Sequence, residues 1–159
     1  MKKTMLLLLW GTFFVYGFIL VIILFLSSRG SWNNLSLIDY MKRLSNFIPF
    51  RTIGGYIRGI SNNTMNLDIP VKNIFGNLLL FLPMGIYLPC LFKKFRKLGE
   101  FMLCMLILLL TIEVFQLLLK RGSFDIDDLI INVTGATIGF RIWNISIIQK
   151  ILNALHLNN

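Results

Sequence analysis

The chain has 159 residues, of which 56% are hydrophobic and 14% are charged, and its formal net charge is +9. A soluble domain of this size rarely contains several long apolar runs, so the composition favours a membrane protein. The positive charge does not by itself indicate a nucleic-acid binder, because basic residues beside membrane spans fix their orientation and contact anionic lipid headgroups.

Four apolar runs approach or exceed the ~20 residues that a helix needs to cross a bilayer. They cover residues 5–26, 71–92, 101–119 and 129–148. The last three contain polar side chains or prolines, which are tolerated in a span when neighbouring helices satisfy the polar groups. The sequence therefore predicts an all-α, polytopic membrane protein with four packed transmembrane helices.

The first run, within residues 1–26, predicts an uncleaved signal-anchor helix. It begins with Lys2 and Lys3 and continues as an uninterrupted apolar stretch. That stretch is longer than the roughly 7–15 apolar residues of a cleaved signal peptide, and no clear cleavage site of small residues follows it.

The next segment, residues 27–70, is expected to form an external loop with one short amphipathic helix. Ser36 and Asp39 have the spacing of a helix-capping box. Apolar residues recur at near-helical spacing over 37–48, and Pro49 ends the pattern. Such a helix lies on the membrane surface. Three glycines are expected to break any long helix over residues 50–60.

Polar side chains interrupt the second and third predicted spans. Glu113 and Gln116 share one face of the third span, and Asn73 and Asn77 share one face of the second. A carboxylate in a span costs roughly 2.5–3.5 kcal/mol at a helix centre, so it usually pairs, faces the protein interior or has a function. The asparagines could join helices by hydrogen bonds or face a ligand.

For Glu113, the simplest structural alternative is an ion pair with a nearby base. Lys120 and Arg121 follow it at the same end of the span, whereas Arg141 is expected toward the opposite side of the membrane. A buried carboxylate that pairs in this way would serve folding rather than function.

An acidic run, Asp125, Asp127 and Asp128, opens the fourth predicted span. One aspartate is explained as a helix cap, but three are more than a cap requires. Asp128 shares a helical stripe with Asn132 and with two glycines, Gly135 and Gly139, whose spacing permits close helix packing. Asp128 and Asn132 are therefore the members of the stripe that are candidates for function.

Basic residues near the span ends predict the orientation. The pair at 2–3 and the cluster at 93–97 favour cytoplasmic N- and C-termini, because basic residues concentrate on the cytoplasmic side. The acidic and amide groups of the last three spans then meet in the external leaflet.

Several of these motifs, taken in order, resemble the VanZ-like family. The resemblance covers residues 46–141, and its matching stretches are 46–53 (NFIPFRTI), 73–85 (NIFGNLLLFLPMG), 113–116 (EVFQ) and 121–140 (RGSFDIDDLIINVTGATIGF). It implies a multi-pass protein of the bacterial plasma membrane. The founding member of the family is associated with resistance to lipid-bearing glycopeptides such as teicoplanin. Residues 142–159 would complete the fourth helix and form a cytoplasmic tail.

Three functions fit this pattern. The first is binding of a membrane lipid, a lipid-linked cell-wall precursor or a lipoglycopeptide, with no cofactor, no metal and no nucleic acid. The second is an enzyme acting on a lipid-linked substrate, with Glu113 and Asp128 as acid/base or metal-site residues. The third is a small proton-coupled transporter. The predicted ligand-binding residues are Asn73, Asn77, Glu113, Gln116, Arg121, Asp125, Asp128 and Asn132.

Overall fold

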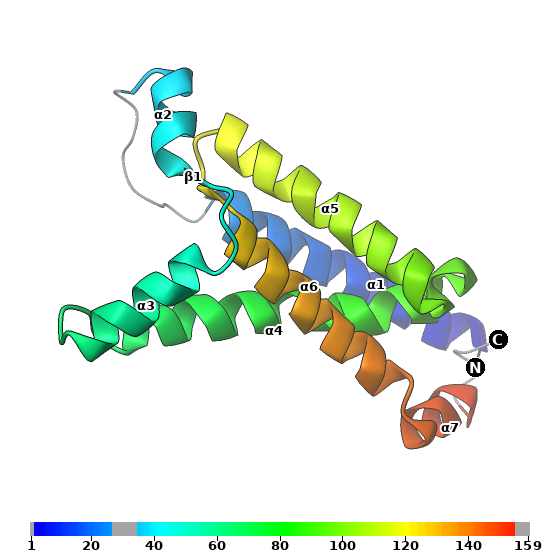
Figure 1. The fold of residues 1–159 in the computed structure, drawn as a ribbon. Coiled ribbons are helices and arrows are strands. Elements are labelled where there is room, and N and C mark those ends of the chain that lie inside the picture. Colours follow the sequence, from blue (N-terminus) through cyan, green and yellow to red (C-terminus); the bar gives the residue numbers. More distant parts are fainter. Residues whose placement is uncertain (1, 27–34, 155–159) are drawn as a thin grey trace.

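The computed structural model describes residues 2–26 and 35–154, and its architecture is all-α, as predicted (Figure 1). Residues 27–34 of the predicted external loop and 155–159 of the predicted tail lie outside the described residues. The elements are α1 (Lys2–Val21), the π-helical turn η1 (Ile22–Leu26), α2 (Leu37–Leu44), β1 (Ser45–Asn46), α3 (Arg51–Ser61), α4 (Asp68–Leu91), the 3-10 turn η2 (Lys93–Arg96), α5 (Leu98–Leu118), β2 (Phe124–Asp125), α6 (Ile126–Trp143) and α7 (Ser146–Ala154).

Three helices in the described part of the chain are long and apolar enough to cross a membrane. They are Lys3–Leu26, Asp68–Leu91 and Leu98–Leu118, so the first three predicted spans are confirmed by length and composition. Only 6% of the most apolar stretch of the first is buried, against 33% in each of the other two. The first span is therefore a peripheral helix, and α4 and α5 belong to the core of the bundle.

The fourth predicted span is shorter than expected. α6 has 18 residues and carries three charged side chains, and it ends at Trp143 with Asn144 as its C-cap. The chain then starts the separate helix α7 at Ser146. The prediction of one continuous helix over 129–148 is wrong at its C-terminal end, because polar residues that favour helix termini interrupt the apolar run.

The segment between the first two spans also differs from the prediction. The Ser36 hydroxyl accepts a hydrogen bond from the Asp39 backbone N–H at 3.1 Å, which confirms Ser36 as the N-cap of α2. α2 ends at Leu44 rather than near residue 48, because the next two residues form β1, which pairs in parallel with β2. The glycines do not prevent a helix, since α3 runs unbroken for 11 residues.

Glycines set the closest helix contact, between α4 and α6. A methyl group on Gly135 would overlap the Leu78 carbonyl oxygen, and one on Gly139 would overlap the Leu82 carbonyl oxygen. The predicted role of these glycines in close packing is confirmed. Gly76, on α4, has open space around it and does not bring the helices together.

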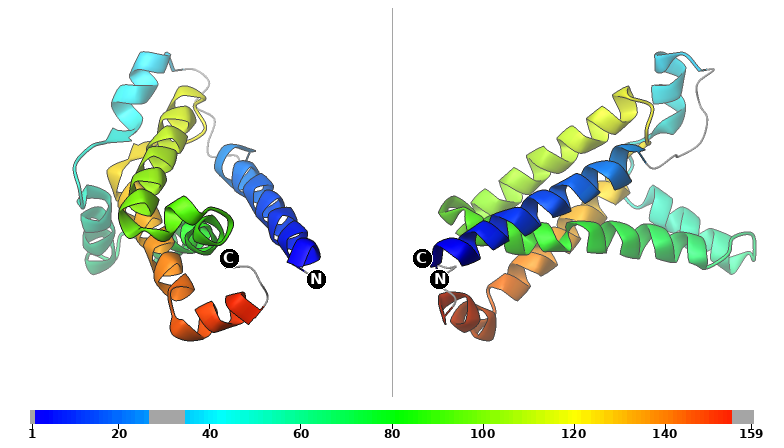
Figure 2. Two further views of the ribbon diagram at one scale, coloured as in Figure 1. Left: turned by 90° about the vertical axis from the view of Figure 1, so that its right-hand side faces the viewer. Right: turned by 180° about the vertical axis from the view of Figure 1, so that it is seen from behind.

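The helices place the polar residues at one end of the bundle. The C-terminal ends of α1 and α5 meet the N-terminal end of α6 there, and η2 and α7 lie at the opposite end (Figures 1 and 2). Fully buried apolar side chains, including Phe81, Phe101 and Met105, fill the interior between the two ends. The Phe101 ring stacks on Phe140 with centroids 4.8 Å apart, which joins α5 to α6.

Candidate functional site

Polar side chains converge where β1 and β2 hold the start of α3 beside the start of α6. Five polar side chains in this region are buried, with exposures of 0–8%. We refer to seven side chains as the polar cluster: Asn77, Glu113, Gln116, Asp125, Asp127, Asp128 and Asn132.

Asp127 is fully buried and caps a helix other than its own. Its carboxylate accepts hydrogen bonds from the backbone N–H groups of Phe50 at 2.5 Å, Thr52 at 2.8 Å and Ile53 at 3.1 Å. α3 begins at Arg51, so these are N–H groups that the helix itself cannot satisfy. A negative charge at this end of a helix is also favourable. Asp127 therefore fixes α3 to α6.

Asp125 is the aspartate that caps α6. Its side chain accepts from the Asp127 backbone N–H at 2.9 Å. It also accepts from the Thr52 hydroxyl at 2.6 Å and from Asn46 Nδ2 at 3.0 Å. Groups of the protein thus occupy both oxygens of this predicted ligand-binding residue, which gives Asp125 a structural role.

Glu113 and Gln116 face the interior, where they connect α5 to two other elements. Glu113 is 4% exposed, and its Oε2 lies 3.4 Å from the Asp125 backbone nitrogen, which donates to it. Gln116 Nε2 donates to the Leu24 carbonyl oxygen at 2.9 Å, within the π-helical turn η1. π-helical turns occur frequently at functional sites.

The three basic residues considered as ion-pair partners of Glu113 lie in different environments. Lys120 Nζ donates to the Leu35 carbonyl oxygen at 2.6 Å. The Arg121 side chain is exposed, and Arg141 is exposed near the far end of α6. Arg121, a predicted ligand-binding residue, is therefore not part of the buried polar cluster.

Asp128 and Asn132 form the part of the polar cluster between α4 and α6. Asp128 is half-buried and accepts from Asn77 Nδ2 at 2.9 Å. Asn132 lies one turn further along α6 and is 4% exposed. The buried Oδ1 atoms of Asn132 and Asn73 have no hydrogen-bond partner within the described residues. A buried acceptor without a donor is costly, so these oxygens suit a donor group from a ligand or water.

Tyr56, on α3, is a member of the site that the sequence did not indicate. Burial raises the pKa of its hydroxyl, and the carboxylates of Asp128, Asp125 and Asp127 raise it further. The phenol therefore stays protonated and can donate a hydrogen bond. No three His, Cys, Asp or Glu side chains within the described residues are grouped so that they could hold a metal ion. The enzyme alternative stays a prediction.

The sequence contained a signal for some of the other residues that build the site, but not for all of them. Asn46 and Thr52 both contact Asp125, and both lie in the first stretch that resembles the family, residues 46–53. That stretch was the available signal for them. Asp127 belonged to an acidic run in which no local pattern distinguishes one aspartate from another.

A model of the VanZ/LLP1 family matches residues 13–149. The chain belongs to this family. The resemblance seen in the sequence is thereby confirmed. This VanZ/LLP1 protein is also similar to "Protein VanZ" of Enterococcus faecium, with 29% identity over 115 residues that cover 72% of this chain and 62% of the relative. It thus spans less than two thirds of that relative's length. No solved structure matches the chain.

Proposed function

We propose that this VanZ/LLP1 protein lies in a bacterial cell envelope and reduces sensitivity to teicoplanin and related lipoglycopeptides. In this proposal the polar cluster engages a lipid or a cell-wall-related ligand at the external leaflet. The observation that carries the proposal is the gathering of buried acidic and amide groups at one end of a bundle whose helices are long enough to cross a membrane. Such groups within membrane helices are rare and are functional candidates by default.

The proposed topology has four spans, with α6 as the fourth and both termini in the cytoplasm. The 18 residues of α6 extend for about 27 Å, close to the ~30 Å of the hydrocarbon layer. Its charged side chains, Asp127, Asp128 and Arg141, all lie near its two ends. The amphipathic helix α2, with Ile38 65% exposed, would lie on the outer surface.

Within the polar cluster, we assign ligand binding to Asp128, Asn132 and Glu113. Asp125 accepts a hydrogen bond from β1, and Asp127 accepts hydrogen bonds from the start of α3. Asp128 is half-buried and therefore accessible in part, and the Oδ1 atom of Asn132 can accept a further donor. A ligand that presents hydroxyl or amino groups fits this set of acceptors.

Deletion and complementation in the native host test the proposal. Cells that lack the gene should become more sensitive to teicoplanin than to vancomycin, and the wild-type gene should restore resistance. Glu113→Gln and Asp128→Asn should fail to restore it, although both variants accumulate in the membrane at wild-type levels.

Asp68→Asn is the matched control, because Asp68 is an exposed acid on α4 that pairs with Lys72 at 3.1 Å. This variant should restore resistance fully. Complete rescue by both Glu113→Gln and Asp128→Asn would exclude a functional role for the negative charges of Glu113 and Asp128. An unchanged sensitivity of the deletion strain would exclude the resistance function itself.

A further inference from the structure

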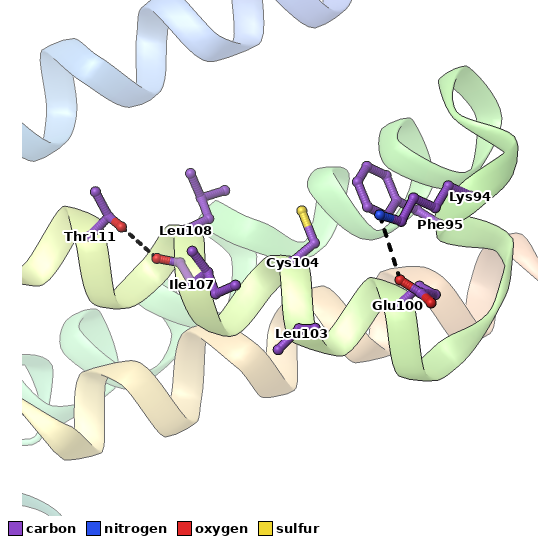
Figure 3. A pocket seen from close by; sticks show the side chains of 8 residues that line it. All are labelled: Lys94, Phe95, Glu100, Leu103, Cys104, Ile107, Leu108 and Thr111. Atoms are coloured by element: carbon purple, nitrogen blue, oxygen red, sulfur yellow. Dashed lines mark hydrogen bonds and ion pairs between the residues drawn. The ribbon is translucent and has the colours of Figure 1, made fainter.

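An apolar groove of about 450 Å³ runs along α5 on the side that faces η2 (Figure 3). Leu103, Ile107 and Leu108 line it from α5, and Phe95 lines it from η2. Thr111 lines the end of the groove that is furthest from η2, and its hydroxyl donates to the Ile107 carbonyl oxygen at 2.7 Å. That donor is satisfied within the helix, so the wall of the groove is apolar.

The length of the groove matches one leaflet of a membrane. Its α5 residues extend from Glu100 to Thr111, eleven residues apart, which corresponds to about 16 Å of helix. Half of the ~30 Å hydrocarbon layer is about 15 Å. A single acyl chain that starts at the η2 end would therefore occupy the groove over its whole length.

The η2 end of the groove is strongly basic. Lys93, Lys94, Arg96 and Lys97 lie within five positions, and Glu100 is an acid nearby that pairs with Lys94. The Lys94–Glu100 pair is long, at 3.9 Å, and its two side chains are 73% and 46% exposed. An exposed pair of this kind is weak, so the Lys94 ammonium can turn to an anion at the membrane surface.

The charge of this end decides between possible occupants. An anionic lipid phosphate complements the basic cluster, and basic sites at helix ends bind such headgroups. A second copy of the chain would bring its own basic cluster to the same place and would be repelled. A zwitterionic lipid could fill the groove but would gain little from the excess positive charge.

We propose that η2 and the α5 groove form a binding site for an anionic phospholipid. The phosphate lies against Lys93 and Lys94, and one acyl chain lies along Leu103, Ile107 and Leu108. The site is at the opposite end of the helices from the polar cluster, so the two proposals are independent.

Lipid binding to the purified full-length protein tests this proposal. Native mass spectrometry would measure the affinity for phosphatidylglycerol and for phosphatidylcholine with identical acyl chains, each titrated into the same detergent. Wild type should bind phosphatidylglycerol more tightly. Each basic charge near a membrane surface strengthens anionic-lipid binding about fivefold, so Lys93→Gln/Lys94→Gln should weaken it about 25-fold.

Three further variants make the result specific. Glu100→Gln should bind phosphatidylglycerol several-fold more tightly, because it removes the opposing charge. Cys104→Phe, which fills the groove without a change in charge, should weaken binding of both lipids. Lys42→Gln/Arg43→Gln removes two exposed charges from α2 and should leave the affinity unchanged.

Three results would overturn the proposal. One is equal affinity of wild type for both lipids, and another is an unchanged affinity in Lys93→Gln/Lys94→Gln. The third is efficient crosslinking of Cys104 to Cys104 of a second copy in a phosphatidylglycerol membrane, which would show that another protein chain covers the groove.

Discussion

Asp127→Ala removes the contact that fixes the start of α3 to α6. In the wild type, one fully buried carboxylate accepts three backbone N–H groups. A single hydrogen bond to a charged group contributes about 1.5–3 kcal/mol, and each buried donor left without an acceptor costs about 1–3 kcal/mol, so three such donors cost at least about 3 kcal/mol together. We therefore expect the free energy of unfolding to fall by about 3–5 kcal/mol.

Thermal unfolding of the purified protein in detergent measures this effect. For a chain of this size a change of 1 kcal/mol shifts Tm by about 2–4 °C, so Tm should fall by roughly 6–20 °C. Hydrogen exchange should also become faster in α3, because its first N–H groups lose their acceptor. Asp68→Ala is the control, since it removes an exposed i,i+4 pair that contributes at most about 0.5 kcal/mol.

One combined result would contradict the capping role of Asp127. If Asp127→Ala keeps both the wild-type Tm and the wild-type exchange rates in α3, the three hydrogen bonds do not hold the helix. A fall in α3 protection with an unchanged Tm would instead mean that α3 detaches locally, and the capping role of Asp127 would stand.

Three other predictions use the same purified protein. Gly139→Ala should lower the free energy of unfolding by about 1–3 kcal/mol, because the new methyl group would overlap the Leu82 carbonyl oxygen. Gly76→Ala should be neutral or should stabilise the protein by up to about 1 kcal/mol, because nothing lies within 4 Å of the new methyl group. The Tm values of the two variants test this difference. Gln116→Leu leaves the Leu24 carbonyl oxygen without its side-chain donor and should lower the free energy of unfolding by about 1–3 kcal/mol. Hydrogen exchange in η1 should become faster, and unchanged exchange there would contradict the prediction. Burial and nearby carboxylates raise the pKa of Tyr56 above its ordinary value of 10.0, so the folded protein holds this proton more tightly than the unfolded chain does. The stability that the protonated Tyr56 hydroxyl contributes is complete below about pH 10 and is lost as the pH rises further. The Tm of Tyr56→Phe should therefore fall less steeply at alkaline pH than the Tm of the wild type. Identical alkaline profiles would contradict this prediction.

Local signals in the sequence predicted the parts of the structure that depend on near neighbours. Run length identified the spans of α1, α4 and α5, and the Ser36–Asp39 spacing identified the start of α2. The glycine spacing of α6 predicted its close contact with α4. Each of these signals is contained within one helical segment, where periodicity and capping rules apply directly.

Helix periodicity and capping rules do not predict contacts between segments that are distant in the sequence. The acceptor for the start of α3 is Asp127, which is 77 positions after Phe50, and Asp125 contacts Asn46 across 79 positions. The glycines of α3 therefore gave a misleading local signal, because a long-range cap stabilises a helix that propensity alone disfavours. The end of α2 was missed for the same reason, since its last predicted residues pair with β2.

The separation of structural from candidate functional acids changes how mutants should be interpreted. Asp127 holds two helices together, so a loss of resistance in an Asp127 variant would not distinguish a missing ligand contact from a displaced α3. Asp128→Asn changes the charge but keeps an oxygen that can accept from Asn77 Nδ2, as the carboxylate does now. If this variant accumulates normally and unfolds at the wild-type temperature but does not restore resistance, then the negative charge of Asp128 acts on something outside the fold. If it restores resistance fully, the Asn77–Asp128 contact is structural, and ligand binding would have to depend on Glu113 and Asn132.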